Sequence, residues 1–69
     1  MAIIKVRQVI GISKTSFDDA IRQIIEEEAV KKGKNVTGLK ILDQTVSVTD
    51  GQIKEYKVNA HIAYKWEER

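Results

Sequence analysis

Few side chains in this sequence could do chemistry at neutral pH, and His61 is the first of them. It is the only histidine, and histidine is the usual proton-transfer group near neutral pH. Lys57 and Asn59 precede it at two-residue spacing. The hydroxyl groups of Thr45 and Ser47 have no base at a spacing that would activate them. With no cysteine and no glycine-rich phosphate loop, the sequence predicts no enzyme and no catalytic residue.

Metal ligands are also scarce. A zinc site needs several cysteine or histidine ligands, and the chain has one histidine and no cysteine. The acidic run at residues 26–28 is interpreted as a solvated helix face, because three consecutive helical residues point in three directions. Asp43 and Glu55 could bind a cation only if symmetry brings several copies together. No metal site is therefore predicted within one chain.

Composition limits the partners and the location. Twelve Lys and Arg against ten Asp and Glu give a net charge of +2, and the basic residues are mostly scattered, which does not indicate nucleic-acid binding. No apolar run approaches the roughly 20 residues of a membrane span. The first residues, MAIIKVRQVIGI, lack the pattern of a secretory leader. We expect a cytoplasmic protein with no membrane partner.

The clearest pattern lies at residues 56–66, YKVNAHIAYKW. Apolar and aromatic side chains fall on every second residue, with mostly polar ones between them. This period of two predicts a strand with one buried and one solvated face. His61 and Lys57 lie on its polar face.

Three further elements precede that strand. Residues 3–12 are rich in β-branched side chains and alternate in part, which favours a strand. An apolar stripe at three-and-four spacing predicts a helix over 17–32, and a second strand is expected over 39–49. The third strand should begin near Ile53. The predicted fold class is α+β: one β-α-β-β domain over residues 1–69, whose three-stranded antiparallel sheet wraps one helix.

Capping and turn residues support these boundaries. Ser16 can cap the helix, with Asp19 three residues later, and Gly33 is suited to its end. Residues 34–38 are expected to be a connection, and Asp50-Gly51 is a hairpin signal. The alternation in the middle strand slips near Ile41, which predicts a bulge or burial on both faces. Gly11 is expected to relieve crowding or to permit a bulge. Residues 67–69 read as a polar tail.

The predicted lengths of the helix and of the last strand indicate that the chain associates with another molecule. A helix over 17–32 is about 24 Å long at roughly 1.5 Å per residue. A strand over 53–66 is about 46 Å long at roughly 3.3 Å per residue. The helix therefore covers about half of the strand, and Tyr64 and Trp66 must contact something else. A second copy of the chain is the simplest candidate, because a core this small without disulfides commonly needs association.

Three stretches of the sequence together resemble the dodecin family: KVRQVIGISKTSFDDAI, LKILDQTVSV and DGQIKEYKVNAHIAYKWEE. The resemblance covers nearly the whole chain. It implies a β-α-β-β subunit that assembles into a hollow homododecamer of cubic symmetry. It also implies storage or buffering of FMN or riboflavin rather than catalysis, and some bacterial members also bind coenzyme A.

The sequence departs from the family at two ligand positions. Where flavin-binding members carry a stacking tryptophan, this chain has Gly38. Where they carry a glutamine that bonds the polar edge of the flavin, it has Lys57, which donates hydrogen bonds but cannot accept them. We therefore predict a dodecin-like shell that holds a small ligand at an altered site. The alternatives are a ligand-free structural shell and a metal-binding variant.

Overall fold

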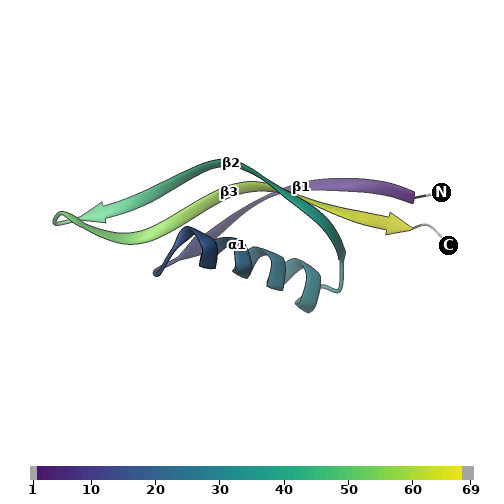
Figure 1. Cartoon of the computed structure of the whole chain (residues 1–69), viewed down its shortest axis with the longest axis horizontal. Helices are drawn as coiled ribbons and strands as arrows, with labels where there is room; N and C mark the ends of the chain where they lie inside the picture. Colours follow the sequence, from purple (N-terminus) through teal and green to yellow (C-terminus); the bar gives the residue numbers. More distant parts are fainter. Residues whose placement is uncertain (1, 68–69) are drawn as a thin grey trace.

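The computed structural model describes residues 2–67, and the side chains of residues 3–66. Strand β1 (Ala2–Ser13) leads into helix α1 (Phe17–Ile25), which continues as a π-helix, η1 (Glu26–Lys31). Strands β2 (Asn35–Thr49) and β3 (Gln52–Glu67) follow (Figure 1). The β-α-β-β order predicted from the sequence is confirmed.

The three strands form one antiparallel sheet in the order β1-β3-β2. The long strand β3 lies in the centre, as expected of the element with the clearest alternation. Helix α1 lies across one face of the sheet, and both ends of the sheet extend past it (Figure 1). We call the face that α1 covers the helix face and the opposite one the outer face.

Local signals explain where the helix begins and ends. The side chain of Ser16 accepts a hydrogen bond of 3.0 Å from the backbone nitrogen of Asp19, which confirms the predicted cap. Gly33 has a φ of 68°, a conformation that favours glycine and ends the helix. The last turns differ from the prediction of one α-helix, because Lys32 donates its backbone N–H to the carbonyl of Glu27, five residues back.

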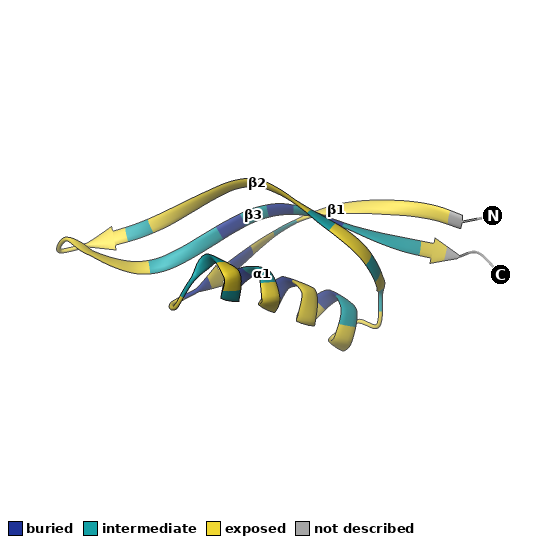
Figure 2. Cartoon of the chain, viewed as in Figure 1, coloured by how far each residue is buried: buried dark blue, intermediate teal, exposed yellow. Residues whose placement is uncertain are grey.

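The core lies between α1 and β3. Ala20 and Ile24 of the helix pack against Val58, Ala60 and Ile62, and all five are buried. Figure 2 shows the buried segments where the helix, β1 and β3 face one another. The polar alternate residues of β3 therefore lie on the outer face.

Gly11 brings the helix close to β1. A Cβ atom at Gly11 would lie 2.7 Å from the carbonyl oxygen of Ala20 and equally close to the side chain of Ile24. The predicted relief of crowding is confirmed. The alternative of a bulge is wrong, because β1 pairs with β3 without a register shift.

The helix packs on the apolar face of β3 but not on the more apolar side of β1. The helix contacts the side of β1 that carries Gly11, where there is room for its backbone. The more apolar side of β1 is on the outer face. Four of its side chains are exposed, to 54%, 60%, 62% and 45%: Ile4, Val6, Ile10 and Ile12.

Two predicted boundaries were wrong. Residues 35–38 are not a connection but the start of β2, because β3 reaches Glu67 and its last residues pair with them. The backbone of Glu67 likewise belongs to β3 rather than to a polar tail; residues 68–69 lie outside the described part of the chain.

Two turn and register predictions were right. A register shift lies between Ile41 and Asp43, where the alternation slips. Asp50 and Gly51 have φ values of 53° and 74°, as the two-residue hairpin requires. Between residues 2 and 67, no helix is long and apolar enough to cross a membrane.

Candidate ligand site

The outer face carries a row of polar side chains across all three strands. Asn59 on β3 accepts a hydrogen bond of 2.9 Å from Nε2 of Gln8 on β1. Its own Nδ2 donates to a carboxylate oxygen of Asp43 on β2, at 3.5 Å. The row is therefore oriented by hydrogen bonds within the chain.

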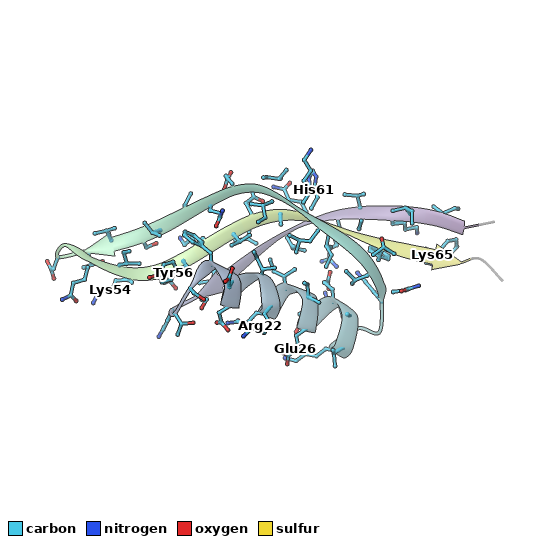
Figure 3. All side chains as sticks on the ribbon, in the orientation of Figure 1. Arg22, Glu26, Lys54, Tyr56, His61 and Lys65 are labelled. Atoms are coloured by element: carbon cyan, nitrogen blue, oxygen red, sulfur yellow. The ribbon has the colours of Figure 1, made fainter. Side chains whose placement is uncertain are left out.

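His61 and Lys57 flank this row on β3. His61 pairs in register with Gln8 and Lys40, and Figure 3 shows its side chain on the side of the sheet away from the helix. Lys57 pairs with Ile12 and Thr45. This part of the outer face thus offers hydrogen-bond donors and one carboxylate, beside the apolar side chains of β1. It suits a polar ligand more than a hydrocarbon.

Gly38 lies far from Lys57 along the direction of the strands. It pairs with Ala63, six residues along β3 from Lys57. At about 3.3 Å per residue the two positions are about 20 Å apart, so a single chain does not bring them together. A Cβ atom at Gly38 would meet nothing within 4 Å, so a side chain has room there.

The aromatic side chains all lie on the other side of the sheet. The chain has one Trp, two Tyr and one Phe. Phe17 of α1 meets Tyr56 edge to face, with ring centroids 5.1 Å apart. Tyr64 and Trp66 follow on the same face of β3 by alternation. A flat ring at Gly38 would therefore find no aromatic partner from the same chain, and Lys57 can only donate. These residues do not fit the stacked arrangement of a flavin-binding dodecin.

Glu28 was missed by the sequence analysis. Its predicted place on a solvated face is wrong, because only 2% of the residue is exposed; Glu26 and Glu27 are exposed as expected. Glu28 follows Ile24 by four residues and so continues the buried stripe of the helix, a signal that could have placed it inside.

Three cations surround the Glu28 carboxylate. Nitrogens of Lys32, Lys34 and Arg7 lie 3.1, 3.5 and 3.7 Å from its oxygens. Burial opposes its ionisation, but the hydrogen bond and charge of Lys32, with the charges of Lys34 and Arg7, outweigh burial and lower its pKa. Three positive charges around one negative charge give this cluster a net positive charge.

Metal ligands do not converge within the part of the chain that the structure describes, where no three His, Asp or Glu side chains gather. Asp43 accepts a hydrogen bond from the side chain of Asn59. Glu55 of β3 lies opposite Ser47 of β2 in the sheet.

The fold and this face define a small α+β protein with one covered and one open sheet face. Residues 3–67 match the model of the dodecin family, and the chain belongs to that family. No curated protein sequence matches it.

Solved structures agree on the fold. Dodecin from Streptomyces davaonensis is 24% identical with a TM-score of 0.85, over 97% of each chain. Dodecin from Streptomyces coelicolor is 20% identical with a TM-score of 0.88, over 99% of this chain and 96% of the other. The calcium-chelating dodecin from Mycobacterium tuberculosis is 22% identical with a TM-score of 0.71, over 97% and 91%.

Proposed function

We propose that this protein is a non-enzymatic, hollow homo-oligomer, a dodecamer by family, that binds and stores a small ligand. The observation that carries the proposal is the uncovered apolar side of β1. Ile4, Val6, Ile10 and Ile12 are each about half exposed or more on one open face, where water is a poor solvent for them. Membership of the dodecin family supports copies of the same chain as the cover.

The ligand site in this proposal lies on the outer face and needs two chains. Gly38 and Lys57 are about 20 Å apart within one chain, so a site containing both positions requires a symmetric neighbour. Lys57 suits a phosphate or carboxylate better than the polar edge of a flavin ring. FMN and riboflavin remain the ligands to test first, because the family suggests them, but stacking at Gly38 is not available to them.

Native mass spectrometry tests the assembly and the ligand together. The protein is purified from a culture supplied with riboflavin. We expect a mass of twelve chains, with added mass if a ligand is retained. A monomer at micromolar concentration would refute the assembly. A twelve-chain mass without added mass, together with no quenching of riboflavin fluorescence, would refute flavin storage but keep the shell.

A second candidate is a ligand-free structural shell. The specific observation in its favour is the lack of any aromatic side chain near Gly38, which removes the main contact for a flat ring. A metal-binding variant is a third reading, supported only by the calcium-chelating relative. Dialysis against calcium followed by metal analysis would distinguish these two. A cytoplasmic location stays a prediction from the sequence, which cell fractionation would test.

A further inference from the structure

A groove lies on the helix face at the end of the sheet where the two termini lie. Its volume is about 650 Å³, and we call it the terminal groove. It begins where the helix ends and lies on the face opposite Gly38 and Lys57. It is lined by Lys5, Gly33, Lys34, Asn35, Tyr64, Lys65 and Trp66.

Two lysines in this groove are held by aromatic rings. Nζ of Lys5 lies 4.4 Å from the ring centroid of Trp66, and Nζ of Lys34 lies 4.5 Å from that of Tyr64. Each ring attracts the positive charge through its face, but a ring face supplies no oxygen acceptor for the ammonium N–H groups. The two ammonium groups are thus positioned while keeping capacity to donate.

Lys34 is fixed from a second direction. It also lies 3.5 Å from a carboxylate oxygen of buried Glu28, and its side chain is only 21% exposed. Because Glu28 is shared with Arg7 and Lys32, it does not neutralise Lys34 fully. Among the described residues no acidic side chain lines the groove itself. Ordered cations that a shared carboxylate neutralises only in part favour an anion, because little conformational entropy is lost when it binds.

We propose that the terminal groove binds a phosphate group between Lys5 and Lys34. Phosphate carries up to two negative charges at neutral pH and several acceptor oxygens, so it matches two ammonium groups better than a single carboxylate does. The phosphate belongs either to a phosphorylated small molecule or to free phosphate. The groove lies on the helix face and is therefore distinct from the ligand site proposed on the outer face.

The single tryptophan of the chain reports directly on the groove. Sodium phosphate and glycerol phosphate are titrated separately into the whole protein at constant ionic strength, while Trp66 emission is recorded. Isothermal titration calorimetry of the same solutions measures binding without relying on the fluorophore. We expect a saturable change with at least one of the two probes. Tighter binding of glycerol phosphate assigns the groove to a phosphorylated molecule, and equal binding assigns it to free phosphate.

Three variants test the residues. Lys5→Gln and Lys34→Gln are each expected to weaken binding about tenfold, the loss typical of one charge-assisted contact. Lys54→Gln removes the same charge near the hairpin, at the other end of the sheet (Figure 3), and should leave binding unchanged. Circular dichroism confirms that each variant is folded. No saturable binding of either probe, or equal binding by all three variants, would overturn the proposal.

The test is separable from that of the shell. Native mass spectrometry reads the number of chains, and the phosphate titration reads the terminal groove. A dodecamer that does not bind phosphate refutes the groove alone. A monomer that binds phosphate refutes the shell alone.

Discussion

Nζ of Lys32 lies 3.1 Å from a carboxylate oxygen of Glu28, and that carboxylate is inside the protein while the lysine is partly in solvent. Lys34, just before β2, and Arg7 of β1 approach the same carboxylate. Glu28, which lies within the π-helix, therefore joins the end of the helix and the residues that follow it to β1, and Arg7 is the one of its three partners that is distant in sequence.

Replacing Glu28 should destabilise the fold. Glu28→Gln leaves three neighbouring cations without their shared counter-charge, and we expect a loss of about 2 kcal/mol in the free energy of unfolding. This is below the roughly 3–5 kcal/mol for breaking a fully buried ion pair, because the cations are partly exposed. Glu27→Gln is the matched control: its pair with Lys31 is exposed and should be worth less than about 0.5 kcal/mol. Urea denaturation compares both, and equal losses would contradict the role of Glu28.

Stability should fall in acid for two identified reasons. Hydrogen bonds from Ser13 and Gln23 lower the pKa of Asp19, and the surrounding cations lower that of Glu28 despite its burial. Since the folded-state pKa values lie below the ordinary values of 3.8 and 4.5, both groups stabilise the fold above those values. That contribution is lost as the pH falls through the lowered values. Urea midpoints between pH 7 and pH 3 should decline less in Glu28→Gln and in Asp19→Asn, and parallel curves would contradict this.

The sequence predicted the element order because its signals are local. Alternation in β3, the Ser16 cap and the Asp50-Gly51 turn each act within a few residues, and each is confirmed. The start of β2 was missed because it depends on pairing with the distant end of β3, which no local signal at residues 35–38 reveals.

The candidate sites were harder to predict, because they depend on which face each strand presents. The partial alternation of β1 does not show which of its sides meets the helix, and the space left at Gly11 decides it. Lys5 and Trp66 are at opposite ends of the sequence, and only the pairing of β1 with β3 brings them together. The terminal groove could not be inferred before that pairing was known.

Gly11 should not tolerate a side chain. In Gly11→Ala the new methyl group would lie 2.7 Å from the Ala20 carbonyl oxygen, so the helix must shift away from β1. We expect a loss of about 1–3 kcal/mol, the usual cost of overpacking a core. Gly38→Ala is the control, since nothing lies within 4 Å of its added methyl group, and its effect should stay within about 0.5 kcal/mol. Thermal unfolding of both variants decides, and a neutral Gly11→Ala would show that the helix contact is loose.

An acidic residue on the apolar side of β1 should prevent assembly. Ile10 is 62% exposed on the outer face, and Ile10→Asp would place a charge where the proposed shell buries apolar surface. We expect native mass spectrometry to show species smaller than the wild-type assembly. Val30→Asp makes a comparable change at a 73% exposed position on η1 and should leave the mass unchanged. If Ile10→Asp keeps the wild-type mass, the outer face of β1 is not an assembly surface.

Restoring the two family residues should restore flavin binding. Gly38 has an open surrounding and a backbone that accepts a side chain, so Gly38→Trp can supply the missing aromatic ring. Lys57→Gln supplies the donor and acceptor pair for the flavin edge. We expect the double variant to quench riboflavin fluorescence with an affinity at least about tenfold above that of the wild type, since aromatic stacking contributes about 0.5–1.5 kcal/mol beyond burial and the amide adds to it. Gly38→Ala with Lys57→Gln controls for the loss of lysine alone. If the Trp and Ala double variants bind riboflavin equally, position 38 does not face the ligand, and the site must lie elsewhere on the shell.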